Sequence, residues 1–542
     1  MKKRILSFVL TVNFLFLFLF GRLFSIALTP QTASHQSSIR VKDIATVRGI
    51  IYDTNLKPLT NDSYTYTACL KPTTRTLTIL NEKGTDKETL EKASKGYFLF
   101  LQTKNADFYG QSDDIKYLPT FKRYNGNTAL HIIGYTDSSG NGVCGIEKYY
   151  NAELTNCGGT LSVAYSADAN GRMLTGEDIE IRDNGYYDKD GIVLTINKDI
   201  QLITENALKK GNIEKGAAVV LDVETSSILA CASTPTYDRD NLVDYINSED
   251  SPFLNRAFSA YPVGSVFKVI TTAAALENDI KISNFNCTGS IEKSANTFNC
   301  NKLEGHGTID LSTAVSMSCN PYFIELGTRV GAEELLHTAE NAGFGKSTDL
   351  GHGYFTDEGI LPDISELNSD AAVGNFAFGQ GRFTATPLQI ATLFATIANN
   401  GVYNEPYLIK GTADKNGALS PNIHTGGVKV FKESTCNTIK NALLKTTTEG
   451  TGTMAFSSLF KSCTKTATAQ SGQYDENGVE IKYCWFAGFF PYNNPKYVVC
   501  ILKENGISGG MDGGPVFKEI CENIYISEEL GGGIRSFGTL TR

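Results

Sequence analysis

The sequence predicts a mixed α/β protein with an N-terminal membrane anchor, a strand-rich pedestal domain and a larger domain. In the larger domain an antiparallel sheet is flanked by helices and accompanied by an all-helical subdomain. Three observations predict this organisation: a long apolar run opens the chain, a stretch ending near residue 190 alternates short strands with turn signals, and strand-like segments beyond it enclose a helical block. At 542 residues, the chain is long enough for two or three domains with separate cores.

Residues 5–28 are predicted to form a transmembrane helix. Three basic residues at positions 2–4 precede this run, and Arg22 is its only charged residue. As a helix the run is about 36 Å long, which is enough to cross a hydrocarbon core of about 30 Å. The basic start predicts a cytoplasmic tail at residues 1–4 and an extracytoplasmic location for everything after residue 28. A cleaved signal peptide is the alternative, but the run is longer than usual and no small-x-small cleavage site follows it.

Residues 29–47 are predicted to be a polar linker and residues 48–190 a pedestal domain of the dimerisation type. Asn-Gly-Asn at 125–127 and Ser-Gly-Asn-Gly at 139–142 are turn signals between its strands. No side chains in this region have catalytic spacing. We therefore expect the region to support or bind rather than to catalyse.

Residues 191–530 are predicted to form the larger domain, with a C-terminal tail at residues 531–542. The predicted strands of this domain are 193–196, 217–222, 228–232, 484–490 and 497–502. The predicted helical segments are 199–210, 311–345, 387–399, 433–447 and 515–524. Strands on both sides of a helical block predict one sheet flanked by helices.

The stretch 255–277 carries the first chemical motif. Ser265 and Lys268 lie three residues apart where an apolar, helix-forming segment begins. Residues at i and i+3 share one face of a helix, so the lysine amine can reach the serine hydroxyl as a base reaches its nucleophile. The helix N-terminus adds N–H groups and partial positive charge. Three other Ser-x-x-Lys matches begin at positions 290, 458 and 462, so the pattern alone is not specific.

Two further motifs follow in the chain. Ser318-Cys319-Asn320 is a Ser-x-Asn triplet between predicted helices, and the segment 465–468 (Lys-Thr-Ala-Thr) precedes the terminal hairpin, where an inner strand is expected. Together with Ser265 and Lys268 they supply a nucleophile, a base, a second hydroxyl that can relay a proton, and groups that can hold a substrate carboxylate. Acyl transfer requires these parts.

The chain at this point resembles a known family, the class B penicillin-binding proteins, which are monofunctional transpeptidases that cross-link peptidoglycan. The resemblance extends from Arg48 to about Ile524 and includes the three motifs. Several ordered motifs at family-like separations make it specific. Its other segments are Arg48-Gly49-x-Ile51-x-Asp53, Tyr261-Pro262-x-Gly264, Pro321-Tyr322-Phe323, Gly379-Gln380-Gly381, Thr386-Pro387-Leu388-Gln389 and Trp485-Phe486-Ala487-Gly488-Phe489-x-Pro491.

The resemblance implies a role for each motif residue. Ser265 would attack the carbonyl between the two D-alanines of a peptidoglycan stem peptide. Lys268 would be the general base, with a pKa lowered by burial and by the neighbouring cation Lys465. Ser318 would relay a proton to the leaving D-alanine, and Asn320 would hold both Lys268 and the substrate amide.

The resemblance also implies the binding groups and partners. Lys465, Thr466 and Thr468 would bind the terminal carboxylate, and the backbone N–H groups of Ser265 and Thr468 would form the oxyanion hole. A second strand's amine would then resolve the acyl-enzyme. β-Lactams would acylate the same serine, and a membrane glycan polymerase of the SEDS family would be the partner protein. No metal or organic cofactor is implied.

One departure from the family pattern concerns the third motif, where Ala467 takes the place usually held by glycine. Glycine lets a strand backbone pass close to a substrate, so the methyl group narrows the cleft or slows acylation. This motivates the alternative of a catalytically weakened scaffold member of the family.

Two rival enzymes share parts of the pattern. A serine β-lactamase of class A adds a glutamate in a Glu-x-x-Leu-Asn loop, but Ile364 occupies that place before Leu367-Asn368. An esterase is suggested by the Gly-Ile-Ser-Gly-Gly segment at 506–510. That fold needs a histidine after the serine, and the last histidine is His424.

The remaining composition argues against metals and nucleic acid. The twelve cysteines show no C-x-x-C, no zinc-type spacing and no clustered His/Cys set, so no metal site is predicted. Cys287 and Cys300 flank a short polar loop and are the predicted disulfide. The other cysteines in apolar segments are predicted to be buried thiols, and Trp485, the only tryptophan, is predicted to pack in the core. A net charge of −9 argues against nucleic acid as a partner.

Overall fold

The structure is a computed structural model that describes residues 2–28, 38–174, 176–424, 426–474 and 478–530. By spatial contacts the chain divides into a smaller unit (residues 1–47, 64–121 and 159–186) and a larger unit (residues 48–63, 122–158 and 187–542). The predicted pedestal at residues 48–190 stays a prediction about domain organisation, because three of its segments (48–63, 122–158 and 187–190) belong to the larger unit.

The smaller unit is built mainly of strands, as predicted for this part of the chain. Its two sheets have the orders β1-β6-β7 and β4-β3-β5. The strands and helices of this part are β1 (Ser38–Val47), β3 (Ser63–Leu70), α2 (Thr74–Glu82), α3 (Lys87–Ser94), β4 (Leu99–Thr103), β5 (Ile115–Lys122), β6 (Gly159–Ala167) and β7 (Glu180–Asn184). The smaller unit also includes α1 (Lys2–Leu28). In the described residues, α1 is the one helix that is long and apolar enough to cross a membrane.

The larger unit is organised around a five-stranded antiparallel sheet with the strand order β10-β9-β23-β22-β21. Its strands are β9 (Gly216–Asp222), β10 (Ile228–Thr234), β21 (Cys463–Tyr474), β22 (Glu480–Phe490) and β23 (Tyr497–Glu504). Successive side chains of a strand point to opposite faces. In β9, Val219 and Leu221 belong to one buried core cluster, while Ala218 and Val220 belong to another. The sheet is therefore covered on both faces.

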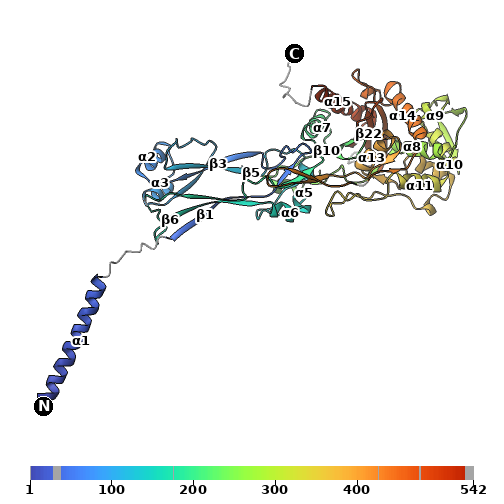
Figure 1. Cartoon of the computed structure of the whole chain (residues 1–542). Coiled ribbons are helices and arrows are strands. Elements are labelled where there is room, and N and C mark those ends of the chain that lie inside the picture. The colour runs from blue at the N-terminus through green and yellow to red at the C-terminus, as the bar shows by residue number, and fades with distance from the viewer. Residues whose placement is uncertain (1, 29–37, 175, 425, 475–477, 531–542) are drawn as a thin grey trace. The chain divides into compact units, whose positions relative to one another are not determined.

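Helices cover the two faces of this sheet, as Figure 1 shows. One face packs against α7 (Lys198–Lys210) and α15 (Gly509–Glu529), and the other packs against α13 (Pro387–Ala398). Every residue of α13 is buried, and Thr386 and Gln389 form a capping box at its start, with proline in the first turn. The predicted layering of helices on a sheet is thus confirmed.

The last helix begins earlier than the predicted residue 515. Ser508 is the N-cap of α15 and accepts a hydrogen bond from the Met511 N–H, so the helix starts at Gly509 and contains Pro515. Helix propensity does not predict the first turns of this helix, because they are rich in glycine and glycine is a poor helix former. Ser508, the serine of the esterase-like segment, has this capping role.

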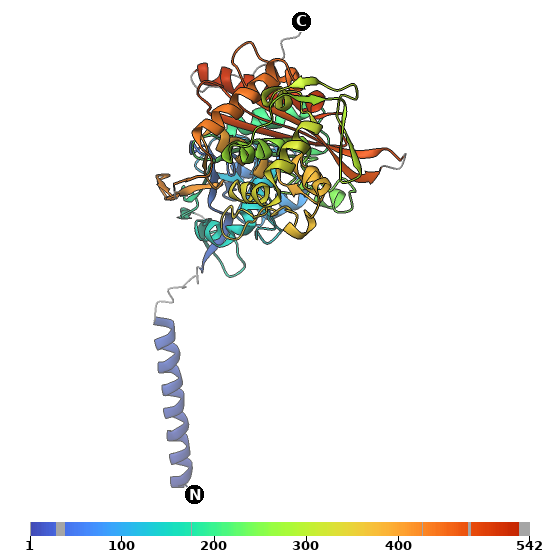
Figure 2. The ribbon, with the colours of Figure 1, turned by 90° about the vertical axis from the view of Figure 1, so that its right-hand side faces the viewer.

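The helical subdomain lies beside the sheet and carries the second motif. In Figure 2, green-to-yellow helices lie next to the orange and red strands, whose β21–β22 hairpin projects to the right. The helices are α8 (Lys268–Glu277), α9 (Leu311–Ser316), α10 (Asn320–Val330), α11 (Ala332–Asn341), α12 (Asp370–Ala377) and α14 (Glu433–Thr448). Two small hairpins precede α9, pairing β12 (Phe285–Cys287) with β15 (Gly307–Ile309) and β13 (Ser290–Lys293) with β14 (Asn296–Asn299).

A second, four-stranded sheet and several short elements complete the larger unit. The sheet has the order β19-β18-β8-β2, formed by β2 (Ile50–Tyr52), β8 (Gly191–Leu194), β18 (Ile409–Ala413) and β19 (Leu419–Pro421). The short elements are α4 (Leu130–Ile133), α5 (Gly145–Tyr149), α6 (Asn151–Asn156), η1 (Leu242–Tyr245), β11 (Tyr261–Pro262), η2 (Gly264–Phe267), η3 (Ile364–Glu366), β16 (Thr384–Ala385), β17 (Val402–Tyr403), β20 (Val428–Lys429) and η4 (Thr453–Ala455).

The third motif lies on β21, at one end of the five-stranded sheet. The prediction of an inner strand is therefore wrong. The long apolar hairpin of β22 and β23 fills the interior of the sheet, and β21 pairs only with β22 within it. An edge strand keeps one row of backbone N–H and C=O groups free of ladder hydrogen bonds. That row is available to a ligand.

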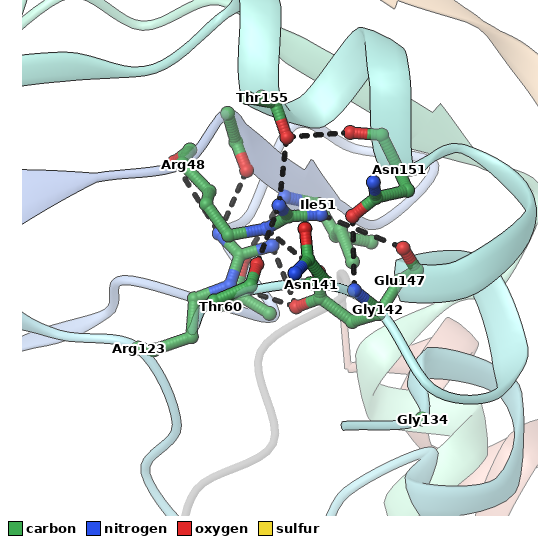
Figure 3. Close-up of polar contacts among 12 residues, drawn as sticks. Arg48, Ile51, Thr60, Arg123, Gly134, Asn141, Gly142, Glu147, Asn151 and Thr155 are labelled. Atoms are coloured by element: carbon green, nitrogen blue, oxygen red, sulfur yellow. Dashed lines mark hydrogen bonds and ion pairs between the residues drawn. The ribbon is translucent and has the colours of Figure 1, made fainter. Parts of the chain in front are cut away.

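A buried ionic network fixes the start of the family-like segment at Arg48 (Figure 3). The Glu147 carboxylate is fully buried and accepts hydrogen bonds from Arg48 Nε at 3.2 Å and Arg123 Nε at 2.8 Å. The same guanidinium groups donate to the carbonyl oxygens of Gly140 and Gly49, at 2.8 and 2.7 Å. The network thus joins α5 to the segments that carry Arg48 and Arg123.

Replacing Glu147 by alanine should strongly destabilise the larger unit. The substitution leaves the Arg48 and Arg123 guanidinium groups without their shared carboxylate, and breaking such a buried pair costs about 3 kcal/mol or more. Urea unfolding followed by the fluorescence of Trp485, which lies in the same unit, measures the loss. The control Glu519→Ala removes an exposed ion pair and should cost less than about 1 kcal/mol. Equal, small losses in both variants would contradict a stabilising role for the network.

Candidate active site

The Ser265 turn is a single 3₁₀ turn, η2, that leads directly into α8 at Lys268. Gly264 has φ +65°, a left-handed conformation that suits glycine, and its N–H donates to the Gly379 carbonyl at 2.8 Å. A Cβ on Gly379 would lie 2.0 Å from the Gly264 oxygen, so glycine is required there as well. The Gly379-Gln380-Gly381 segment thus packs against the backbone of the Ser265 turn.

Trp485 is fully buried and donates its indole N–H to the Pro262 carbonyl at 2.8 Å. The predicted packing role of this tryptophan is confirmed. Its hydrogen bond attaches the approach to Ser265 to strand β22.

The second motif is a turn between α9 and α10. Cys319 is the N-cap residue of α10, and Asn320 begins the helix with Pro321 in its first turn. Ser318 has φ +56°, a left-handed conformation that is uncommon for residues other than glycine. This backbone places both the carbonyl and the hydroxyl of Ser318 toward Lys268.

Lys268 lies at the centre of the polar site. Its side chain is fully buried, and Nζ donates to Asn320 Oδ1 at 2.6 Å, to the Ser318 carbonyl at 2.8 Å and to Ser318 Oγ at 3.2 Å. The Asn320 amide is held from its other end as well, since Nδ2 donates to the Asn299 carbonyl at 3.0 Å. The structure therefore brings the first and second motifs together.

Lys465 reaches the same hydroxyl from strand β21. Its Nζ lies 3.0 Å from Ser318 Oγ and 2.8 Å from the Thr466 carbonyl, and its side chain is also fully buried. One hydroxyl thus lies within hydrogen-bonding distance of two amines. A serine hydroxyl both donates and accepts, so it can join an ammonium to an uncharged amine.

Burial shifts the pKa of both lysines downward. It lowers the pKa of Lys268 from 10.5 to about 7. It lowers the pKa of Lys465 well below the usual value, with the positive charge of Lys268 as a second cause. Burial thus lowers the pKa of Lys268, as predicted. The repulsion between the two cations, also predicted to act on Lys268, instead lowers the pKa of Lys465. The two sites favour a single positive charge between them.

A cavity of about 380 Å³ opens onto these groups. Its lining includes Ser265, Ser318, Asn320 and the three residues 466–468. These are all of the predicted site residues except the two fully buried lysines. In the described part of the chain, no Asp or Glu lines this cavity. The deacylating glutamate of a class A β-lactamase therefore has no counterpart among its lining residues.

The predicted contact between the Ser265 and Lys268 side chains is not observed. Among the described contacts, no hydrogen bond joins their side chains, and Lys268 is directed instead to Ser318 and Asn320. Catalytic hydrogen bonds are often long without substrate. The base role of Lys268 thus stays a prediction, as do the oxyanion-hole roles of the Ser265 and Thr468 backbones.

Ala467 faces the large core rather than solvent. It belongs to the same buried cluster as Ala469 on β21 and is 3% exposed. Thr466 and Thr468 alternate with it, and the Thr466 hydroxyl lies 2.7 Å from that of Thr451. Ala467 also lines the cavity, between the two threonines along β21.

The sequence patterns missed a second wall of the cavity. It is formed by Thr451 and Met454 and by the first turn of α15, residues 508–511. The Gly509 N–H donates to Thr468 Oγ1 at 3.3 Å, and a Cβ on Gly509 would lie 2.4 Å from the Ala467 oxygen. The glycine pair at 509–510 was the available signal, because close approach of two backbones requires glycine.

The cysteines differ from the prediction in two ways. All twelve are free thiols, so the predicted Cys287–Cys300 disulfide is wrong in this structure. The expectation of no clustered His/Cys set is also wrong, since Cys287, Cys300, His306 and Cys319 come together. Their separations along the chain are long, and only the small hairpins bring them to one place. The buried thiols predicted elsewhere are confirmed.

A serine at a cavity backed by two buried lysines is the arrangement used by the class of active-serine acyl-transfer enzymes. The chain belongs to the penicillin-binding protein transpeptidase family: the family model described as "Penicillin binding protein transpeptidase domain" matches residues 216–525. The predicted family and fold class are confirmed.

Relatives of this chain carry transpeptidase and sporulation names. It is 32% identical over 436 residues to stage V sporulation protein D of Bacillus subtilis, an alignment that covers 77% of this chain and 64% of that protein. It is 28% identical over 484 residues to peptidoglycan D,D-transpeptidase MrdA of Haemophilus influenzae, covering 78% of this chain and 72% of that protein. The chain thus spans slightly less than two thirds of the sporulation protein's length.

A solved structure confirms the fold. The D,D-transpeptidase domain of a peptidoglycan glycosyltransferase from Eggerthella lenta has a TM-score of 0.65 and 26% sequence identity, and the match covers 90% of this chain and 99% of that chain.

Proposed function

We propose that this protein is a peptidoglycan D,D-transpeptidase that cross-links stem peptides through an acyl-enzyme on Ser265. The observation that carries the proposal is the Ser318 hydroxyl held between two fully buried lysines beside a cavity that Ser265 lines. This arrangement supplies an uncharged amine near neutral pH, which the activation of a serine hydroxyl requires.

The proton route follows from the contacts of Lys268. Uncharged Lys268 takes the proton of Ser265 as its oxygen attacks the carbonyl between the two D-alanines. The C–N bond then breaks, and the departing D-alanine amine gains a proton through the Ser318 hydroxyl. In the second half, an amine of another strand attacks the ester, and Ser265 recovers its proton as the new amide forms. Asn320 holds Lys268 at 2.6 Å throughout.

The substrate's terminal carboxylate is placed by β21. Lys465, Thr466 and Thr468 lie along this edge strand, and Thr466 and Thr468 line the cavity. The backbone N–H groups of Ser265 and Thr468 would hold the oxyanion of the tetrahedral intermediate. β-Lactams, which place a carboxylate and a strained amide at similar positions, would acylate the same serine.

The location and partner follow from α1 and from the family. Among the described residues α1 is the one helix that could span a membrane, and the basic residues at its start support a catalytic part outside the cytoplasm, where peptidoglycan is assembled. A membrane glycan polymerase of the SEDS family would supply the strands to be cross-linked. Ala467 supports a second candidate, a catalytically weakened scaffold, because it takes the place of the family's glycine in a segment that lines the cavity.

Labelled penicillin should form a stable adduct on Ser265 of the full chain in detergent, because the proposed acyl-enzyme has no carboxylate beside it to activate water. Intact-mass measurement and peptide mapping locate the adduct, and the Ser265→Ala variant should form none. Rapid loss of the adduct would instead indicate a β-lactamase. Absence of an adduct at any concentration would support the scaffold.

The acylation rate should rise with pH, with an apparent pKa near 7, because only the uncharged Lys268 accepts the proton of Ser265. Below this pKa the uncharged fraction, and with it the rate, should fall about tenfold per pH unit. Single-turnover acylation between pH 5.5 and 8.5 measures this, with Trp485 fluorescence as the check that the protein stays folded. A flat profile would contradict Lys268 as the base.

Replacing Ala467 by glycine should speed acylation, since glycine lets the β21 backbone approach the substrate more closely. We expect an increase of roughly tenfold, because a misplacement of about 1 Å can cost a hundredfold in rate. The matched control is Ala469→Gly, which removes a methyl group from the same face of β21 but outside the cavity lining. Equal rates in Ala467→Gly and the unaltered protein would show that the cavity already accommodates the methyl group.

A further inference from the structure

Three thiols and one imidazole meet beside the second motif. The Sγ atoms of Cys287, Cys300 and Cys319 and a ring nitrogen of His306 all lie within 4.8 Å of one another. They come from four places in the chain: the end of β12, the residue after β14, the residue before β15 and the N-cap of α10. No predicted role in acyl transfer uses any of them.

Two separations within the cluster are close to those of ligands around one metal ion. Cys300 Sγ lies 3.9 Å from Cys319 Sγ and 3.4 Å from His306 Nδ1. Around a tetrahedral zinc ion, with Zn–S near 2.3 Å and Zn–N near 2.05 Å, sulfurs lie about 3.8 Å apart and sulfur and nitrogen about 3.6 Å apart. Thiols that merely pack in a core have no reason to match this geometry and to include an imidazole.

The segment 285–309 needs such a support, because it has almost no core of its own. Its two hairpins bury only three side chains, those of Cys287, Cys300 and Ile309. Two of these three are members of the cluster. Segments that cannot bury enough apolar surface are stabilised by disulfides or by a structural metal.

The cluster is continuous with the candidate active site. Cys319 stands between Ser318 and Asn320, and its thiol belongs to the cluster while its neighbours contact Lys268. The loop that carries Cys300 is attached to the same turn, since Asn320 donates to the Asn299 carbonyl at 3.0 Å.

We propose that Cys287, Cys300, His306 and Cys319 form a structural Zn²⁺ site that fixes the Ser318–Asn320 turn. A Cys₃His set is one of the closed, four-coordinate sets typical of structural zinc, and soft thiolates disfavour Mg²⁺ and Ca²⁺. On binding, the three thiols release their protons to solvent as the Zn–S bonds form. The site itself does not depend on the proposed function. Its positioning role does, because that role concerns acylation of Ser265.

A disulfide is the competing use of these cysteines. Joining any two would leave one thiol and His306 without a shared partner, and it would need the sulfurs to approach to about 2.05 Å. Cys300 and Cys319 lie at 3.9 Å, and both are free thiols in this structure. The zinc site uses all four side chains, whose ligand atoms already lie within 4.8 Å of one another.

Metal content tests the site directly. Full-length protein, purified in detergent without a histidine tag or added chelator, should contain one zinc per chain by elemental mass spectrometry. Cys319→Ser and His306→Ala should lose most of it. The control Cys500→Ala, which removes a buried thiol of β23 outside the cluster, should keep it. Zinc-free protein with reduced thiols, or a mapped disulfide between two of the four positions, would overturn the site.

Cobalt substitution tests the same metal site in the unaltered protein, so it does not depend on whether the variants fold. Unaltered protein depleted by a chelator and given Co²⁺ should show thiolate-to-metal charge transfer and the intense visible bands of a tetrahedral ion. Weak bands of octahedral Co²⁺, without charge transfer, would contradict thiolate ligands.

The positioning role is tested separately with labelled penicillin. Removing zinc from the unaltered protein should slow acylation of Ser265 at least tenfold, and restoring zinc should recover the rate. Unchanged acylation after verified zinc loss would overturn the positioning role and leave the metal site standing. A zinc-loaded protein that is never acylated would instead contradict the proposed function.

Discussion

One serine hydroxyl between two buried amines is the constraint on which the site depends. Lys268 and Lys465 have no exposed surface, and their hydrogen-bond acceptors are uncharged oxygens of Ser318, Asn320 and Thr466. Two full positive charges there would each cost several kcal/mol of desolvation without a carboxylate to offset it. The fold therefore holds an amine that gives up its proton near neutral pH, and this is the property that makes a lysine a base.

The architecture explains how this costly arrangement is maintained. The three motifs come from the start of α8, the turn before α10 and the edge strand β21, and each is attached to the same large core. Helices bury both faces of the five-stranded sheet, so its edge strand is held by packing although one side of it lacks a neighbouring strand. Rigid supports keep reacting groups in place better than loops do.

Ser318 and Cys319 of the second motif lie in a turn between helices rather than within a long element. Ser318 has a left-handed backbone, and the hairpins beside it have little apolar surface to bury. The cluster formed by three cysteines and His306 lies within these hairpins and beside this turn, where little apolar surface is buried. The buried Glu147 network solves a similar problem elsewhere in the larger unit, by ionic contacts in place of apolar packing.

The sequence by itself determined the elements and the order of the motifs. Helix-forming patterns located α7 and α13, apolar runs located β9 and β23, and the three motifs named one wall of the cavity. Only the tertiary structure decided that Lys268 contacts Ser318, that β21 is an edge strand, and that four distant Cys and His residues meet. The physical reason is that side-chain patterns report the environment of one element at a time. Distances between side chains of different elements depend on how those elements pack, and no local pattern encodes them.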